Sequence, residues 1–289
     1  MPSSGIMLTV LLGGLALAGT ATAAEPQKVW EASGLKNPES AVYDPASGAI
    51  CVSNVNGEPA AKDGNGFVSK LTPDGKITAL EWVKGLDAPK GLALAGGKLY
   101  AADIDRLVEI DVAGGEVVAR HDAPGAKFLN DLTADAAGRV YASDMATSSV
   151  WVLEGGKLSV LVRDDALDHP NGLLAEEGRL VVASWGSMDP AAPTQASGHL
   201  RVVDLATKRV SDLGTPTLTG KLDGVVPDGK GGYLVTDWVN GGLFRATTQG
   251  ESARLLPLKQ GSADLGTGPG GLVLIPMMME DTLLAYRID

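Results

Sequence analysis

Cysteine is nearly absent from this sequence: of its 289 residues only one, Cys51, is a cysteine. A single cysteine cannot form an internal disulfide, so the stability of the chain must come from packing, even in an oxidising compartment. Cys51 lies in the apolar segment 49–52, and its small side chain is expected to be buried there. Hydrophobic residues make up 44% of the chain and charged residues 20%, which suits a buried core and gives no sign of disorder.

Positive charge and long apolar segments are also scarce. The chain has 24 Lys and Arg against 35 Asp and Glu, a formal net charge of −11. Such a surface repels phosphate backbones, so we expect no nucleic-acid partner and favour a cation or a small-molecule substrate. After residue 24 no long apolar run follows, so we expect no membrane contact by the mature chain. No segment repeats apolar residues at i, i+3 and i+4, so we expect no long helix.

The N-terminal segment has the pattern of a secretory signal peptide. Residues 6–18 are almost wholly apolar, a run too short to span a bilayer, and Ala21-Thr22-Ala23 gives an A-x-A cleavage signal. We therefore predict a signal peptide over 1–24, a mature domain over 25–289, and a periplasmic or secreted protein. No Lys or Arg precedes the apolar run, and an uncleaved anchor or a misassigned start codon is the alternative.

A short phrase recurs six times: a polar residue, an apolar alternation, a glycine-containing turn and a second apolar strand. Its copies begin PESAVYD, APKGLAL, FLNDLTA, HPNGLLA, KLDGVVP and SADLGTG, and their polar positions are Glu39, Lys90, Asn130, Asn171, Asp223 and Asp264. The spacings of 51, 40, 41, 52 and 41 residues suit blades of four short strands, which need about 40–45 residues each. The sequence therefore predicts an all-β fold, a six-bladed β-propeller. The short last unit would be completed, and the ring closed, by the N-terminal strand 28–32.

The six polar positions would meet at the axis of such a ring, because the first strand of each blade is innermost. Buried charges cost several kcal/mol unless they are paired. Three carboxylates and one ammonium sum to a charge of −2, which one divalent cation would neutralise. The donors are all oxygens, which favours calcium over zinc or copper. Alternatively, the ring could bind buried waters, with Lys90 paired to Glu39 or Asp264.

The two long spacings place insertions in the first and fourth units, opposite each other in a six-fold ring. The extra residues fit best as the loops 54–66 and 185–198, which are rich in Gly, Pro, Ala, Asn and Ser. We predict that they form facing walls of a substrate cleft; the alternative is a pair of tolerated surface insertions. Asp103, Asp144 and Asp237 end second strands near this mouth and are expected to hold loops by hydrogen bonds.

The phrases His169-Pro170-Asn171-Gly172-Leu173 and Leu222-Asp223-Gly224-Val225 carry a resemblance that spans the mature chain. They resemble the senescence-marker-protein and gluconolactonase family, which is similar in design to paraoxonase and diisopropyl fluorophosphatase. The resemblance implies a catalytic divalent cation held by Glu39, Asn130, Asn171 and Asp223. Lys90 departs from that pattern, and the three histidines offer no pair that could act as a general base.

The resemblance and the polar ring together predict a calcium-dependent hydrolase of a lactone or related ester. Asp223 would be the general base or nucleophile, and Lys90 would stabilise the oxyanion or compensate charge. Asp264 would be an additional ligand or would orient the ligands. A different class remains open, a non-catalytic periplasmic propeller that binds a small molecule or a protein around a structural ion. A metal-free synthase on the same scaffold is a third.

Overall fold

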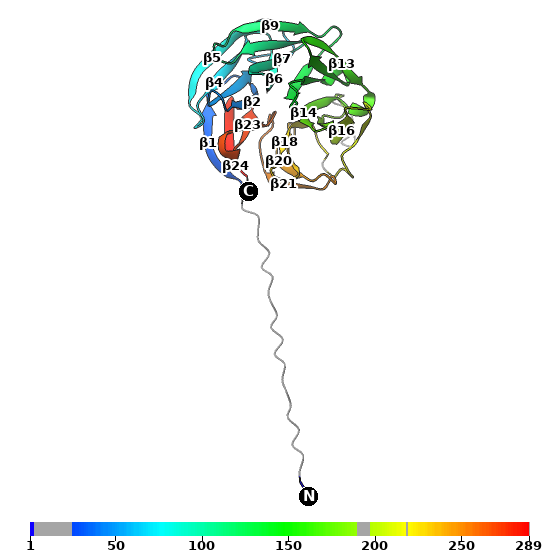
Figure 1. Cartoon of the computed structure of the whole chain (residues 1–289). Helices are drawn as coiled ribbons and strands as arrows, with labels where there is room; N and C mark the ends of the chain where they lie inside the picture. Colours follow the sequence, from blue (N-terminus) through cyan, green and yellow to red (C-terminus); the bar gives the residue numbers. More distant parts are fainter. Residues whose placement is uncertain (3–24, 190–196, 218, 289) are drawn as a thin grey trace.

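The computed structural model describes residues 1–2, 25–189, 197–217 and 219–288. The apolar run and cleavage signal of the predicted signal peptide lie outside these residues. The described chain forms six four-stranded antiparallel sheets arranged in a ring around a central axis (Figure 1). The predicted all-β, six-bladed β-propeller is therefore confirmed.

The first three blades follow one another along the chain, each with its first strand innermost. Their strands are β2 (Pro38–Asp44), β3 (Ala49–Asn54), β4 (Gly66–Leu71) and β5 (Ile77–Leu86) in blade 1; β6 (Pro89–Ala95), β7 (Lys98–Asp103), β8 (Arg106–Asp111) and β9 (Val117–Asp122) in blade 2; and β10 (Leu129–Ala134), β11 (Val140–Asp144), β12 (Ser149–Glu154) and β13 (Lys157–Arg163) in blade 3.

The last three blades continue the order, and the sixth takes one strand from the start of the chain. Their strands are β14 (Pro170–Glu176), β15 (Arg179–Ser184), β16 (Leu200–Asp204) and β17 (Val210–Asp212) in blade 4; β18 (Leu222–Pro227), β19 (Tyr233–Asp237), β20 (Leu243–Ala246) and β21 (Ser252–Leu256) in blade 5; and β22 (Gly266–Thr267), β23 (Val273–Met277), β24 (Thr282–Arg287) and β1 (Gln27–Ser33) in blade 6.

The ring is closed by pairing between the two ends of the described chain. Strand β1 pairs antiparallel with β24, from Gln27 opposite Arg287 to Ser33 opposite Thr282. The predicted closing strand is thus confirmed, and Figure 1 shows β1 beside β24 at the rim of the ring. In the described part of the chain, the assigned helices are short 3₁₀ turns, at Met145–Thr147, Asp165–Leu167 and Pro269–Gly271. None of the described helices has the length and apolar character to cross a membrane.

The hydrophobic core lies between blades, because each blade is covered on both faces by its neighbours. Alternate side chains of a strand point to opposite faces. In β3, Val52 packs with Leu274 and Leu283 of blade 6, while the adjacent Cys51 packs with Leu99 of blade 2. Cys51 is fully buried, as its place in an apolar strand predicted.

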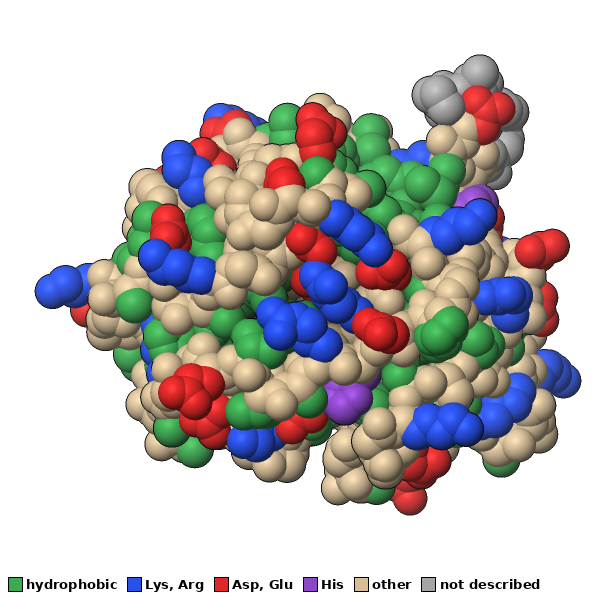
Figure 2. Space-filling view, turned by 90° about the horizontal axis from the view of Figure 1, so that it is seen from above, with side chains coloured by type: hydrophobic (Ala, Val, Ile, Leu, Met, Phe, Trp, Pro, Cys, Tyr) green, Lys and Arg blue, Asp and Glu red, His purple; other side chains and the backbone are tan. Residues whose placement is uncertain are grey.

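The outer surface carries side chains of both charges. Figure 2 shows Lys and Arg side chains interspersed with Asp and Glu on one face, with apolar residues between them. The net negative charge is therefore not gathered into a single acidic face in this view.

The innermost strands share an irregularity that shapes the centre of the ring. The pairing register of β2, β6, β10, β14 and β18 with the second strand of each blade shifts after the first residue, as in a β-bulge. The shift falls at a residue pair, Glu39-Ser40 in blade 1 and Asp223-Gly224 in blade 5, for example. Bulges re-aim side chains and are common beside functional sites. Here they carry the recurrent polar residue.

Candidate functional site at one mouth of the central channel

The first residue of each bulge lines one cavity at the axis. Five side chains meet there, one from each of blades 1 to 5, and each is at most 5% exposed: Glu39, Lys90, Asn130, Asn171 and Asp223. The cavity has a volume of about 240 Å³. The repeat thus brings together five of the six side chains that the sequence placed at the channel, and we call these five the polar floor.

The sixth predicted position, Asp264, is one residue out of register and does not line this cavity. The Thr236 hydroxyl donates to the carbonyl of Ala263 at 2.8 Å, as the Ser143 hydroxyl donates to that of Asn171 at 2.7 Å. Ala263 therefore holds in blade 6 the position that Asn171 holds in blade 4, and its methyl group cannot bind a cation.

Asp264 corresponds instead to the second bulge residues, and with one of them, Asp131, it lines a separate cavity of about 130 Å³. Its carboxylate accepts a hydrogen bond from the Ser40 hydroxyl at 2.6 Å. The Asp131 carboxylate accepts from the amide of Leu173 in the next blade at 2.6 Å. The alignment of six polar positions was thus wrong at the last blade, and Asp264 sits behind the polar floor as part of a second acidic layer.

Hydroxyl side chains fix the bulges of alternate blades. The backbone amides of Ser40, Asp131 and Gly224 donate to the hydroxyls of Ser53, Ser143 and Thr236 at 2.9 Å in each case. These hydroxyls are fully buried on the second strands. The bulge amides are thereby satisfied without a strand partner, so the polar side chain before each one can point into the channel.

The polar floor has unpartnered oxygen atoms that match a cation site. Oε2 of Glu39, Oδ1 of Asn130 and Oδ1 of Asp223 are buried and accept no hydrogen bond. The Asn130 amide donates to Oδ1 of Asn171, whose oxygen keeps a second lone pair. Buried oxygens without donors cost free energy unless something positive faces them. Four converging oxygens from two carboxylates and two amides are a donor set for a hard cation such as calcium.

Half of this ligand set consists of neutral amides rather than carboxylates, imidazoles or thiolates. No group of three His, Cys, Asp or Glu side chains suited to a metal occurs within the described ranges. None of the histidines lines the cavity: His121 on β9 contacts Glu109 at 3.0 Å, and His199, directly before β16, contacts Asp212 at 2.8 Å. A metal on the polar floor would depend on the two amides as much as on the two carboxylates.

Burial raises the pKa of both floor carboxylates. Desolvation is the main cause for Glu39, and the charges of Asp223 and Asp264 raise its pKa further. Desolvation and the charge of Asp264 likewise raise the pKa of Asp223, opposed by a hydrogen bond from Asn171. The uncompensated negative charge at the axis is therefore unfavourable, which a bound cation would relieve.

Lys90 is held at the edge of the polar floor by carbonyl oxygens and an aromatic ring. Its ammonium donates to the carbonyls of Pro59 at 2.7 Å and Ala88 at 3.0 Å, and it lies 4.5 Å from the centre of the Phe128 ring. Desolvation lowers its pKa to about 8, although the charge of Glu39 opposes that shift. None of the ion pairs found among the described residues joins Lys90 to Glu39 or Asp264, so the salt bridge considered as an alternative to a metal is not formed.

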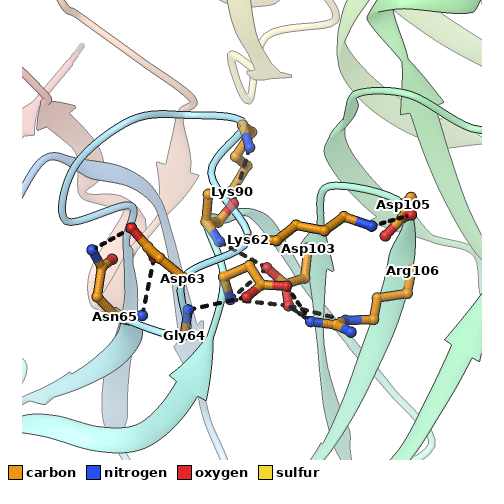
Figure 3. Close-up of polar contacts among 10 residues, drawn as sticks. Lys62, Asp63, Gly64, Asn65, Lys90, Asp103, Asp105 and Arg106 are labelled. Atoms are coloured by element: carbon orange, nitrogen blue, oxygen red, sulfur yellow. Dashed lines mark hydrogen bonds and ion pairs between the residues drawn. The ribbon is translucent and has the colours of Figure 1, made fainter.

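The aspartates at the ends of second strands hold the loops that position Lys90. Asp103 accepts hydrogen bonds from the amides of Asp87 and Ala88, and Asp144 accepts from the amide of Phe128 at 3.1 Å. Figure 3 shows Asp103 also joined to Arg106, with Lys62 of the 55–65 loop reaching Asp105. The loop-holding role predicted for Asp103 and Asp144 is therefore observed.

The walls above the polar floor are apolar and come from loops of five blades. Seven side chains form them: Pro59, Phe128, Met145, Trp185, Met188, Trp238 and Met278. Both predicted insertions contribute, Pro59 from the first and Trp185 with Met188 from the second; residues 190–196 of the second lie outside the described residues. No sequence pattern pointed to Phe128, Met145, Trp238 or Met278. Each of them lies directly beside the start of an inner strand or the end of a second strand.

Comparison with known proteins supports the fold. No family model and no curated protein matches the sequence. A protein assigned as a gluconolactonase superposes with a TM-score of 0.67 at 22% identity, covering 93% of this chain and 94% of that one. A gluconolactonase from Xanthomonas campestris gives 0.67 at 16% identity over 91% and 89% of the two chains. Virginiamycin B lyase from Staphylococcus aureus gives 0.64 at 12% identity over 92% and 100%.

These likenesses define the class of protein as a six-bladed β-propeller. Two of the three structures bear the family name that the blade phrases resemble, so that resemblance is confirmed at the level of the fold. At such identities, the activity must be argued from the residues of this chain.

Proposed function

We propose that this protein is a calcium-dependent hydrolase of a lactone or related ester, acting at the polar floor. The observation that carries the proposal is the set of buried, unpartnered oxygens of Glu39, Asn130 and Asp223 at the base of a cavity. These three and Asn171 would hold the ion. When bound, calcium would polarise the carbonyl oxygen of the substrate and stabilise the negative charge that develops there.

The side chains of the floor would handle the proton and the developing charge. Asp223 keeps a carboxylate oxygen besides the unpartnered Oδ1, and this oxygen would accept the proton of the attacking water. The ammonium of Lys90 has three donors, two of them used by Pro59 and Ala88. The third would donate to the oxyanion. The walls would exclude bulk water from the reacting carbonyl.

The test is metal content and turnover of the mature protein, with Asp264→Asn as the matched control. One calcium per chain is expected. Turnover of simple lactones or aryl esters should be lost on chelation, recovered on adding calcium, and strongly reduced in Asp223→Asn but not in Asp264→Asn. Calcium without turnover would support a binding propeller with a structural ion, and absence of bound metal would overturn the proposal.

The lyase among the structural neighbours makes the mode of bond cleavage worth measuring directly. Hydrolysis adds water to the product, whereas elimination does not. Turnover in ¹⁸O-labelled water should therefore give a product two mass units heavier for a hydrolase, and an unlabelled product would indicate a lyase.

A further inference from the structure

The walls of the cavity differ in character from its floor. Charged and amide groups are confined to the polar floor, and the side chains above it are Met, Trp, Phe and Pro. Loops near a channel mouth are exposed to water and are usually polar, so seven apolar residues from five blades are an unexpected convergence. Hydrophobic residues scattered singly over a surface would need no explanation, but these seven line the same cavity.

Methionine in particular is concentrated at this site. Five methionines follow residue 24, and three of them, Met145, Met188 and Met278, line the cavity. Met188 is 48% exposed, which places it at the rim. Methionine is flexible and polarisable and packs against apolar ligands of varied shape. The two Trp rings, Trp185 and Trp238, have centres 5.9 Å apart and add a rigid aromatic surface.

These walls offer a poor match for a substrate rich in hydroxyl groups. Each sugar hydroxyl would lose its bonds to water and would need a donor or acceptor in the site. Phe and Pro side chains supply neither, the Met sulfur is only a weak acceptor, and each Trp offers a single N–H donor and no acceptor. Two of the three Lys90 donors are used by carbonyls, and the third is assigned to the oxyanion, which leaves none for a sugar hydroxyl. A hydrocarbon group would lose no hydrogen bonds and would gain about 0.8 kcal/mol per buried methylene, about fourfold in affinity.

The cavity also limits the size of its ligand. Its volume of about 240 Å³ lies below the range of roughly 300–1,000 Å³ that is typical of sites for drug-sized ligands. A single ring with a short alkyl or aryl substituent suits this volume.

We propose that the cavity selects a hydrophobic lactone or ester, one that carries an alkyl or aryl group, over a polyhydroxylated sugar lactone. This inference rests on the proposed function for its reaction and on the cavity walls for its selectivity. The reaction is addition of water to the ester carbonyl and cleavage of the ester C–O bond, which gives a carboxylate and an alcohol.

The experiment compares kcat/KM for a series of alkyl-substituted δ-lactones and for glucono-δ-lactone, with calcium present and spontaneous hydrolysis subtracted. We expect the alkyl lactones to be preferred at least tenfold, with a rise of about fourfold for each added methylene until the cavity is full. A preference for gluconolactone would overturn the inference and leave the hydrolase in place.

Two neighbouring methionines give a matched pair of variants. Met278 lines the cavity, whereas Met279 is 59% exposed and is not part of the lining. Met278→Gln keeps the length of the side chain and should lower kcat/KM for the alkyl lactones about tenfold, with gluconolactone changed less than twofold. Met279→Gln should change neither. Equal loss on both substrates in Met278→Gln would contradict selection by the walls.

If neither lactone is hydrolysed, the proposed function is contradicted, but the selectivity of the cavity can still be tested by binding. Lactams resist hydrolysis, and the fluorescence of Trp185 and Trp238, which line the cavity, should respond to a ligand bound against them. An alkyl δ-lactam should then bind at least tenfold more tightly than a polyhydroxylated δ-lactam. Equal or reversed affinities would overturn the inference.

Discussion

Replacement of Asp223 by asparagine should have opposite effects on stability with and without calcium. Asp223 is 4% exposed and its Oδ1 accepts no hydrogen bond. Without a cation its negative charge is unfavourable, and burial with the charge of Asp264 raises its pKa. Asparagine has nearly the same shape and no charge, so it should stabilise the metal-free protein. The same change removes a charged ligand, so it should weaken the stabilisation by calcium.

The expected magnitudes follow from burial and from binding linkage. An uncompensated buried charge costs about 3–5 kcal/mol, part of which the group avoids by taking up a proton. We therefore expect Asp223→Asn to raise the free energy of unfolding in chelator by about 1–2 kcal/mol, which is about 2–8 °C in Tm for a domain of this size. Calcium at about a hundred times its Kd should stabilise the wild type by about 2.7 kcal/mol and the variant by far less.

The assay is thermal unfolding at pH 7 in chelator and in excess calcium, with Asp264→Asn as the control. The control also removes a buried carboxylate, but one of the second acidic layer that does not line the ion site, so its gain from calcium should fall far less than that of Asp223→Asn. A variant Asp223→Asn that is destabilised in chelator and still gains fully from calcium would refute the assignment of Asp223 to the ion.

The same carboxylate sets the direction of the pH dependence. A raised pKa means that the folded chain holds the proton of Asp223 more tightly than the unfolded chain. The stability that this contributes is complete below the ordinary pKa of 3.8 and is lost as the pH rises through the folded value. Metal-free wild type should therefore lose stability as the pH rises through this range, and Asp223→Asn should lose less.

Three further outcomes are expected. Lys90→Met removes a positive charge beside the ion, so calcium affinity should be kept or increased while kcat falls about 100-fold; loss of calcium binding would contradict its position at the edge of the floor. Gly172→Ala should lower the free energy of unfolding in urea by more than about 2 kcal/mol, because the added Cβ would lie 2.0 Å from the Asp223 carbonyl oxygen. Gly114→Ala is the control, since its Cβ would meet only ordinary contacts of 3.5 Å and longer. The thiol of Cys51 is fully buried, and burial raises its pKa to about 12. A thiol reagent should therefore label Cys51 only as the protein unfolds, and rapid labelling of the native protein would refute this.

Much of the fold is encoded locally and could therefore be predicted. Each blade begins with the same strand–turn–strand phrase, so the repeat appears in the sequence at spacings of 40 to 52 residues. The polar floor was predictable for the same reason: Asn130 and Asn171 occupy the same place in two copies of one phrase. The closing strand was expected because the sixth copy is short by one strand.

The errors lie where the repeat weakens. In blade 6 the innermost strand, β22, is only two residues long, and Asp264 follows Ala263, so either could be placed at the recurrent position. The hydrogen bond from Thr236 to the Ala263 carbonyl decides the register, and such a contact between blades leaves no mark in the sequence. Phe128 and Met278 lie in loops without a period, so only the three-dimensional arrangement shows that they share one cavity.

The closure of the ring has a consequence for the order of events during synthesis. Strand β1 leaves the ribosome first, yet its partner β24 follows about 250 residues later, a wait of roughly 10–50 s at translation rates of about 5–20 residues per second. An unpaired apolar strand would invite aggregation during such a delay. Strand β1 is mostly exposed and carries a Lys28–Glu31 ion pair of 2.9 Å. Its sequence is therefore suited to remaining solvated until the final strand arrives.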